Sequence, residues 1–174
     1  GYGYDDNGNV LSSSNLSGQK SKATYDSANN AITYVQPGRD DTDANRHLAY
    51  YGSTAADKKK HLPWRTRTPM QVTDYFSYDS FGNPLSSRRV NYKVFSENAA
   101  ENANPYIRTE STYTADGNYS ASTKDARGNV VSQVVNQKDG TLQSVTDPTN
   151  QTVNYTYDAS KRVTSVQTTG DGKT

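Results

Sequence analysis

Apolar and polar residues alternate along much of this chain, and short turn-forming segments interrupt the alternation. Successive residues of an extended strand point to opposite faces of a sheet, so such alternation is typical of strands. In the segment that follows Asp147, the apolar set is Val153, Tyr155 and Tyr157, and the polar set is Thr152, Asn154 and Thr156. The pattern predicts a strand with one buried and one solvent-exposed face.

The turn-forming segments recur every 11 residues. Counting from Asp125, steps of 11 reach Thr114, Asn136, Asp147, Asp158 and Thr169. Asp57, Thr68 and Asp79 keep the same step, whereas Asp5 and Asp26 are 21 residues apart. Such a period leaves about five residues for a turn and about six for a strand. A connection that short joins antiparallel neighbours, because parallel pairing needs a crossover of a dozen or more residues. We therefore expect an all-β fold, a meander of antiparallel β-hairpins whose twist makes a curved sheet.

Two positions of each unit carry turn-forming residues. In successive units the first position is occupied by Asp5, Asp26, Asp79, Asp125, Asp147 and Asp158. The fourth position is occupied by Gly8, Asn29, Gly82, Gly117, Gly128, Asp139 and Asn150. An Asp can accept a hydrogen bond from the backbone two residues on, and Gly, Asn and Asp tolerate a positive φ. Acid–base catalysis needs carboxylates that converge on one substrate, whereas these aspartates recur at separate turns. We interpret both sets as structural turn residues.

Two segments depart from the 11-residue period. Residues 37–71 read as an irregular insertion: a long loop with a short helix in 37–56, within "DANRHLAYY", and then a strand near 62–68. Thr54 and Asp57 form a capping-box pattern, which competes with a turn at Asp57. A polar loop over 96–105 separates two longer strands, "RRVNYKVF" and "YIRTESTYT". The chain then divides into first repeats (2–36), the insertion (37–71) and regular repeats (72–174), all in one β-sheet segment (1–174).

Composition favours a thin sheet with wet faces. Hydrophobic residues make up only 31% of the chain and the mean hydropathy is −1.00, which approaches the composition of disordered proteins. The 14 tyrosines and the many Thr and Ser residues nevertheless suit a half-buried pleated surface. A net charge of +1 gives no reason to expect nucleic acid or an anionic membrane as partner. No apolar run reaches the roughly 20 residues that a transmembrane helix needs, so we expect no membrane insertion.

The sequence predicts no catalytic residue, no metal site and no cofactor. The absence of cysteine excludes disulfides and cysteine-based metal sites or nucleophiles. The terminal "TGDGKT" lacks the first glycine of a phosphate-binding loop, since residue 167 is Gln167. His47 and His61 are the only histidines, which is too few for a histidine-based metal site.

Trp64 is the one candidate for contact with a ligand. It is the only tryptophan and lies in "DKKKHLPWRTR", among five cationic residues. This segment can bind an anionic partner or a glycan through charge and aromatic stacking. Alternatively, Trp64 packs under the 37–56 loop while the cations are solvated. The sequence leaves both interpretations open.

Four segments resemble the tyrosine–aspartate (YD) repeats of RHS-repeat proteins. They are "GYGYDDNGNVLSS", "ATYDSANNAITYV", "FSYDSFGNPLSS" and "VTDPTNQTVNYTYDASKRVTSV". The similarity is strongest at the dipeptides Tyr4-Asp5, Tyr25-Asp26, Tyr78-Asp79 and Tyr157-Asp158, each followed by a turn of the "xxGN" type. Thr114 and Lys124 depart from the dipeptide pattern.

The resemblance implies a structural role. Proteins of this family form ribbons of β-hairpins that spiral into a hollow shell, which in bacterial toxins encloses a C-terminal toxic domain. Similar repeats are displayed on bacterial walls, and teneurins use them in an extracellular barrel. Some members cleave themselves with aspartates of a core segment, for which this sequence has no counterpart. We therefore expect a scaffold segment of a bacterial, secreted or wall-associated protein that encloses an effector or mediates cell contact.

An alternative function is an extracellular β module that binds glycans or proteins. The chain begins without Met and shows no signal peptide, so we expect a piece of a longer protein. The expected partners are neighbouring repeats of the parent protein and an enclosed effector domain or a cell-surface glycan. Open edges on the first and last strands also predict self-association.

Overall fold

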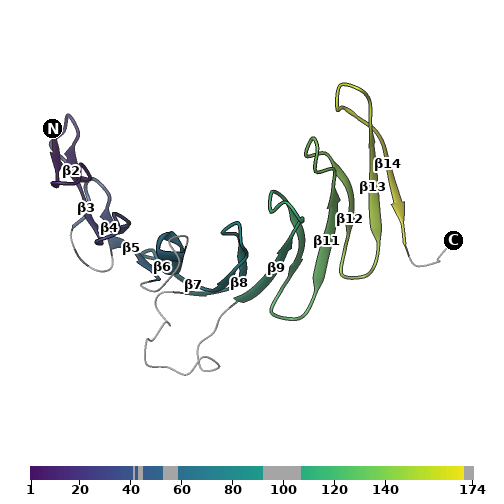
Figure 1. The fold of residues 1–174 in the computed structure, drawn as a ribbon, viewed down its shortest axis with the longest axis horizontal. Helices are drawn as coiled ribbons and strands as arrows, with labels where there is room; N and C mark the ends of the chain where they lie inside the picture. The colour runs from purple at the N-terminus through teal and green to yellow at the C-terminus, as the bar shows by residue number, and fades with distance from the viewer. Residues whose placement is uncertain (41, 43–44, 53–58, 92–106, 171–174) are drawn as a thin grey trace. The chain divides into compact units, whose positions relative to one another are not determined.

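The computed structural model describes residues 1–40, 42, 45–52, 59–91 and 107–170. In these residues the secondary structure consists of 14 β-strands and short 3-10 turns, among them the 3-10 helix η2 (Lys59–His61), and there is no α-helix. The strands form one sheet in which each lies beside its neighbours in sequence (Figure 1). All pairs with a described register are antiparallel. The predicted all-β meander of hairpins is confirmed.

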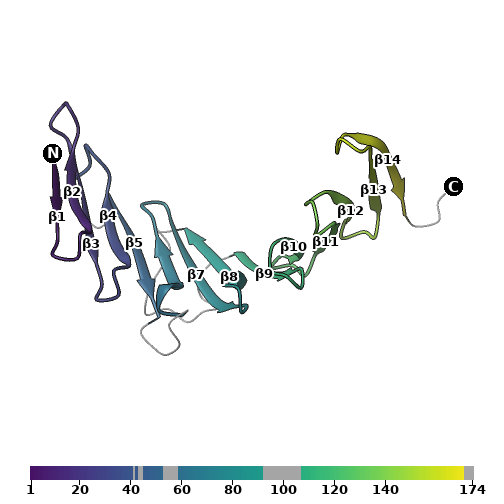
Figure 2. The same ribbon diagram turned by 45° about the horizontal axis from the view of Figure 1, so that its top comes forward.

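The chain divides into two compact units. Unit 1 comprises residues 1–76 and 88–106, and unit 2 comprises residues 77–87 and 107–174. The strands of unit 1 are β1 (Tyr2–Tyr4), β2 (Val10–Ser14), β3 (Lys20–Tyr25), β4 (Ala31–Val35), β5 (Arg46–Tyr51) and β6 (Pro63–Arg67). Figure 2 shows β1 to β5 side by side.

The next two strands, β7 (Gln71–Tyr78) and β8 (Pro84–Asn91), contribute residues to both units. The strands of unit 2 are β9 (Ile107–Tyr113), β10 (Ser120–Lys124), β11 (Val130–Val135), β12 (Leu142–Thr146), β13 (Thr152–Tyr157) and β14 (Val163–Thr169). The division of the sequence at residues 37 and 71 stays a prediction.

The prediction of a short helix within residues 37–56 was wrong. Residues Arg46–Tyr51 form β5, which pairs with β4 on one side and β6 on the other. Backbone hydrogen bonds to two neighbouring strands override a weak local preference for helix. The strand predicted near 62–68 is present as β6. The capping box at Thr54 and Asp57 and the loop over 96–105 lie outside the described residues.

Two kinds of hairpin alternate along the described sheet. In six pairs (β1–β2, β3–β4, β5–β6, β9–β10, β11–β12 and β13–β14) the register shifts beside the turn, as in a β-bulge. The other described pairs (β2–β3, β4–β5, β6–β7, β10–β11 and β12–β13) have no shift. A bulge adds a residue to one strand and increases the local twist. The structural repeat is therefore two strands, twice the period of the sequence.

The sheet has little apolar core. Among the described residues the buried hydrophobic side chains are Val35, Val72 and Val90, all in unit 1. In β13 the expected buried and exposed faces do not separate, because Tyr155 and Asn154 are both half-buried. Hydroxyl pairs that bridge neighbouring strands supply part of the cohesion, namely Ser13–Ser21, Thr24–Thr33, Thr112–Ser122, Thr146–Thr152 and Thr156–Thr164. Such cross-strand pairs contribute roughly 0.2–1 kcal/mol each.

Candidate functional site

The turns share one hydrogen-bonding arrangement, which is clearest at Asp5. Its Oδ1 accepts the backbone N–H groups of Asn7 (3.0 Å) and Asn9 (2.8 Å), and its Oδ2 accepts the side-chain amide of Asn9 (2.9 Å). Gly8 takes φ +83°, and the backbone N–H of Asp5 donates to the carbonyl of Asn9 (3.0 Å). A single carboxylate thus satisfies three donors and closes the turn.

The same arrangement recurs along the chain. Asp26, Asp79 and Asp125 accept equivalent bonds from the residues two and four positions later, including the side-chain amides of Asn30, Asn83 and Asn129. Asp147 and Asp158 also accept two backbone N–H groups, with Thr149 or Arg162 as the side-chain donor. Positive φ values occur at Asn29, Gly82, Gly117, Gly128 and Asn150.

The fourth-position assignment of Asp139 was wrong. In that loop the residue with positive φ is Gly140, at +74°. The loop is one residue longer than the turns that begin with Asp, because the backbone N–H of Asn136 donates to the carbonyl of Thr141, five residues on. The loop of Thr114 has the same length, since the backbone N–H of Thr114 donates to the carbonyl of Tyr119. The left-handed residue is the fifth of the Asn136 loop, whereas in the Thr114 loop it is the fourth, Gly117.

Sequence reasoning gave no role to the asparagine at the fifth position. Besides closing its own turn, this side chain reaches the next turn on the same side of the sheet. The amide of Asn9 donates to Asn29 Oδ1 (3.0 Å), that of Asn30 to the Lys60 carbonyl (2.8 Å), and that of Asn83 to the Gly117 carbonyl (2.7 Å). The recurrence of Asn after the left-handed residue was the available signal.

The tyrosine of the Tyr-Asp dipeptide forms a second link between strands. The hydroxyl of Tyr25, the last residue of β3, donates to the carbonyl of Val10, the first residue of β2 (3.2 Å). Tyr157, which ends β13, bonds in the same way to Leu142, which begins β12 (2.7 Å). Tyr113, which is followed by Thr114 rather than by Asp, makes the same contact with Pro84 between β9 and β8 (3.3 Å). The Tyr-Asp dipeptide therefore joins a turn to a link with the preceding strand.

Removing the hydroxyl of Tyr157 should weaken unit 2. We expect Tyr157→Phe to lower the free energy of unfolding by about 1 kcal/mol, the usual contribution of one such hydrogen bond. Urea denaturation followed by circular dichroism measures the change. Tyr2→Phe is the matched control, because the Tyr2 side chain is 71% exposed. Equal losses in the two variants would contradict the assigned role.

A buried charge cluster lies in unit 1 around Asp74 of β7, which is only 4% exposed. Its Oδ1 accepts a hydrogen bond from Arg65 Nε (2.5 Å), and its Oδ2 accepts one from Arg88 Nε (2.7 Å). Burial raises the pKa of Asp74, but the hydrogen bonds from Arg65 and Arg88 outweigh it and hold the pKa below its usual value. Sequence reasoning missed this cluster, although Asp inside a strand is unusual.

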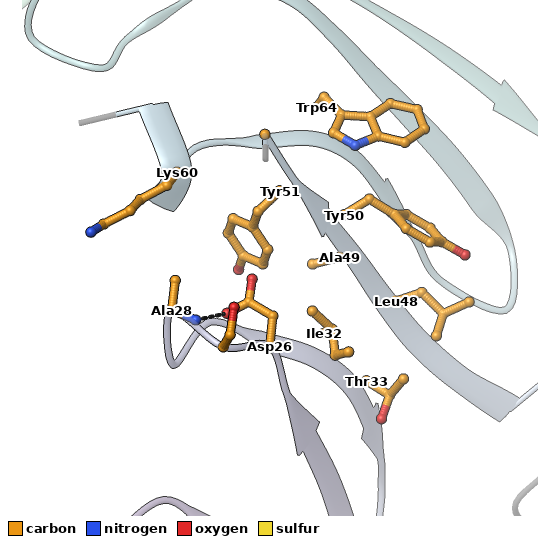
Figure 3. Close-up of a pocket in the computed structure, with 12 residues that line it drawn as sticks. Asp26, Ala28, Ile32, Thr33, Leu48, Ala49, Tyr50, Tyr51, Lys60 and Trp64 are labelled. Atoms are coloured by element: carbon orange, nitrogen blue, oxygen red, sulfur yellow. Dashed lines mark hydrogen bonds between the residues drawn. The ribbon is translucent and has the colours of Figure 1, made fainter. Parts of the chain in front are cut away.

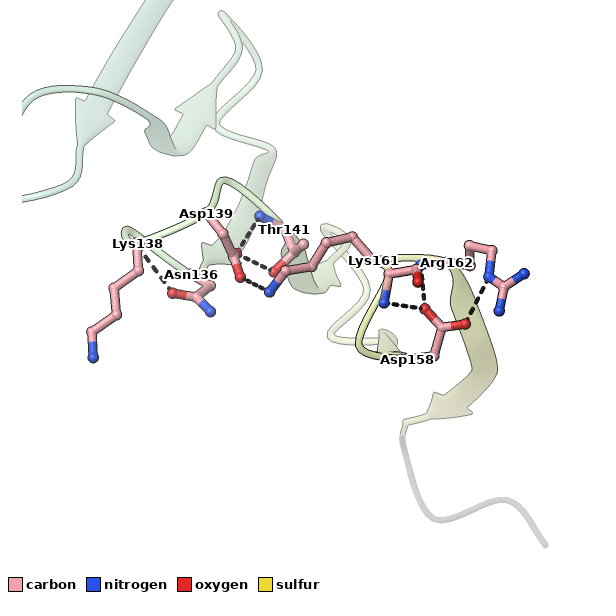
Figure 4. A network of polar contacts seen from close by, with 8 residues as sticks. Asn136, Lys138, Asp139, Thr141, Asp158, Lys161 and Arg162 are labelled. Carbon is pink, nitrogen blue, oxygen red and sulfur yellow. Dashed lines mark hydrogen bonds and ion pairs between the residues drawn. The ribbon is translucent and has the colours of Figure 1, made fainter.

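In unit 2, one ion pair links the loop of Asn136 to the turn of Asp158, and a second lies within that turn (Figure 4). Lys161 Nζ contacts Asp139 Oδ2, and Arg162 Nε donates to Asp158 Oδ2 (2.7 Å). The hydrogen bond from Lys161, with further bonds from Thr141, lowers the pKa of Asp139 to about 2. Both pairs are solvent-accessible, so each adds little to stability.

Acid should weaken the fold. The hydrogen bond from the Asn9 side chain lowers the pKa of Asp5, and that from Asn129 lowers the pKa of Asp125. A lowered folded-state pKa gives stability that is present above the ordinary value of 3.8 and is lost as the pH falls through the folded-state value. We expect Tm to fall progressively below about pH 4, where the carboxylates become protonated. Thermal unfolding followed at several pH values tests this, and an unchanged Tm in acid would contradict it.

Trp64 borders an open hollow of about 570 Å³ on one face of β4, β5 and β6 (Figure 3). Its ring lies 5.5 Å from that of Tyr50, and the guanidinium of Arg65 lies 4.8 Å from its centre. Trp64 is 44% exposed, so it is neither packed away nor fully solvated. His61 Nδ1 is within 2.7 Å of Asn30 Oδ1, at the neighbouring turn.

Comparison with protein families matches residues 138–174 to the RHS Repeat family. These C-terminal residues are similar to an RHS repeat. The predicted resemblance is confirmed, and the matched residues include the Tyr157-Asp158 dipeptide and its turn. No curated protein sequence matches the chain.

Solved structures share the fold of this chain. A crystal structure of TcdB2-TccC3 is 17% identical, with a TM-score of 0.54, and the alignment covers 96% of this chain and 10% of that chain. The structure of TcdB2-TccC3 without its hypervariable C-terminal region is also 17% identical, with a TM-score of 0.53, and the alignment covers 96% of this chain and 10% of that chain. The structure of TcdB2-TccC3-Cdc42 is 17% identical, with a TM-score of 0.51, and the alignment covers 93% of this chain and 10% of that chain. The chain thus spans about a tenth of the length of these relatives.

The contacts of the turn aspartates are structural. Among the residues that the structure describes, no three His, Asp or Glu side chains are grouped to hold a metal ion. The search of the same residues for a helix long and apolar enough to cross a bilayer found none. Each turn aspartate instead uses its oxygens on donors of its own turn, as at Asp5 and Asp125.

Proposed function

We propose that this chain is a wall segment of a secreted RHS protein and serves as a scaffold without chemistry of its own. The observation that supports the proposal is the sheet itself, in which strands follow one another in chain order and asparagine side chains link turns that lie two strands apart. Each repeat is stabilised by its neighbours, so length adds stability without a central core. Such an array can be extended indefinitely, which suits a wall.

The wall role includes enclosure of an effector domain that follows the repeats in the parent protein. The support for enclosure is the RHS match together with the Tyr-Asp resemblance. One of the similar structures is a complex studied without a hypervariable C-terminal region, which agrees with a variable domain in that protein. Secretion follows from the same resemblance.

Protease protection tests the enclosure. The full-length parent protein is digested with proteinase K, next to the domain that follows the repeats expressed on its own. We expect the domain to resist cleavage inside the parent and to be degraded when free. Equal cleavage rates would contradict enclosure and leave the repeats as a displayed scaffold.

The edges of the array are the proposed contact surfaces for further repeats. In β1, Tyr2 and Tyr4 are 71% and 58% exposed, and in β14, Val163 and Val166 are 52% and 57% exposed. Exposed strand edges pair readily with other strands. We expect the isolated 174-residue chain to associate as its concentration rises, as measured by light scattering. A strict monomer at high concentration would contradict edge pairing.

A further inference from the structure

We propose that the hollow beside Trp64 binds a neutral saccharide. This Trp64 hollow is bordered by Asp26, Ala28, Ile32, Leu48, Tyr50, Tyr51, Lys60 and Trp64 (Figure 3). All these residues belong to unit 1. The inference does not depend on the wall role, since a scaffold and a displayed module can both carry such a site.

The register shift of the β5–β6 pair explains how Trp64 comes to border the hollow. Tyr50 pairs with Arg65 and Tyr51 pairs with Pro63, so Trp64 is the additional residue in β6. In a bulge two residues of one strand oppose a single residue of the partner, which interrupts the strict alternation of side chains between the two faces. Trp64 therefore lies beside Tyr50, with ring centres 5.5 Å apart. Without the bulge, strict alternation would place the two rings on opposite faces.

The two rings present aromatic surface to solvent. Trp64 is 44% exposed and Tyr50 is 38% exposed, although each has the bulk to fill a core. Arg65, which is bonded to Asp74, lies 4.8 Å from the centre of the Trp64 ring and holds that side chain in place. Rigid, partly exposed Tyr and Trp rings are typical of binding surfaces because they combine an apolar face with a polar tip.

The hollow has the size and lining of a small-molecule site. Its volume of about 570 Å³ lies within the usual range of ligand pockets. Ile32, Leu48 and Ala49 contribute apolar surface between the aromatic pair and the turn of Asp26. This arrangement gives a ligand an apolar surface to contact on one side and a polar turn on the other.

The charge of the lining favours a neutral ligand rich in hydroxyl groups. Among the described residues of the lining, Asp26 and Lys60 are the only ionisable ones apart from the tyrosines, and their charges cancel. Asp26 already accepts hydrogen bonds from the backbone of Ala28 and Asn30 and from the side chain of Asn30. The other polar groups are the hydroxyls of Ser27, Thr33, Tyr50 and Tyr51. A sugar ring, with an apolar face and hydroxyls at its edge, matches this lining, whereas a polyanion needs several cations.

The fluorescence of Trp64, the only tryptophan in the chain, reports directly on the site. The 174-residue chain is titrated with neutral trisaccharides (cellotriose, chitotriose and maltotriose), with a sulfated heparin trisaccharide and with choline. We expect a saturable change in emission with at least one neutral trisaccharide and a dissociation constant below about 1 mM. No change with any neutral sugar, or a change only with the sulfated sugar or choline, would overturn the proposal.

Variants locate the binding. Tyr50→Ala is expected to weaken binding at least about tenfold. Ala28→Arg is expected to block the hollow without harming the turn, because Arg127 occupies the same turn position after Asp125. Tyr2→Ala and Ser160→Arg, an exposed aromatic and a turn position elsewhere, are the controls. Binding that survives both Tyr50→Ala and Ala28→Arg in folded protein would also overturn the proposal.

Discussion

Asp74→Asn is expected to lower the free energy of unfolding of unit 1 by about 3–5 kcal/mol, the usual cost of breaking a buried ion pair. The substitution keeps the shape of the side chain but removes the anion shared by Arg65 and Arg88, whose side chains are only 12% and 11% exposed. Urea denaturation measures the loss. Hydrogen exchange should show it first in β6, β7 and the part of β8 that carries Arg88.

Two further variants separate charge from packing at Asp74. Asp125→Asn is the control, because Asp125 is an exposed turn residue in unit 2, and its effect should be much smaller. The triple replacement Arg65→Met, Asp74→Leu and Arg88→Met is expected to recover much of the lost stability, since apolar residues can replace a buried charge cluster. A loss for Asp74→Asn no greater than that for Asp125→Asn would contradict the role of the cluster.

Gly117→Ala is expected to cost about 2–4 kcal/mol, because it combines two separate penalties. Residue 117 has φ +74°, where a side chain costs about 1–2 kcal/mol. The added Cβ would also lie 2.9 Å from Phe81 Cβ and nearer still to its ring, and such overpacking costs about 1–3 kcal/mol. Urea denaturation of unit 2 measures the sum.

The chain offers a matched control for each penalty. Gly128 has φ +88° and open space around an added Cβ, so Gly128→Ala carries the backbone penalty alone. The double variant Phe81→Gly, Gly117→Ala removes the ring and the Cβ of residue 81, so it should return to the level expected from the backbone penalty, which a double-mutant cycle resolves. Additive effects of the two substitutions would show that the contact with Phe81 carries no cost.

Local features of the fold could be predicted from the sequence. Turn chemistry acts over five residues, so the spacing of Asp125 and Gly128 was enough to predict a hairpin. The alternation of apolar and polar residues predicted strands, and the short connections predicted their antiparallel order. The prediction for residues 46–51 failed because their helix-like pattern is local, whereas β5 is stabilised by pairing with strands on both sides.

Features that depend on register could not be predicted. Asp74 meets Arg65 because β6 and β7 pair without a shift, and Trp64 meets Tyr50 because β5 and β6 pair with one. A one-residue slip moves a side chain to the other face of a sheet, and no local pattern fixes the slip. The hydrogen bond from Tyr157 to Leu142 likewise joins two strands and depends on their register.

Electron cryomicroscopy of the full-length parent protein tests the wall role most directly. We predict that β1 and β14 each pair with a strand of a neighbouring repeat, and that the continued sheet borders a cavity containing the domain that follows. Solvent-exposed edges at both β1 and β14, with that domain outside the sheet, would contradict it.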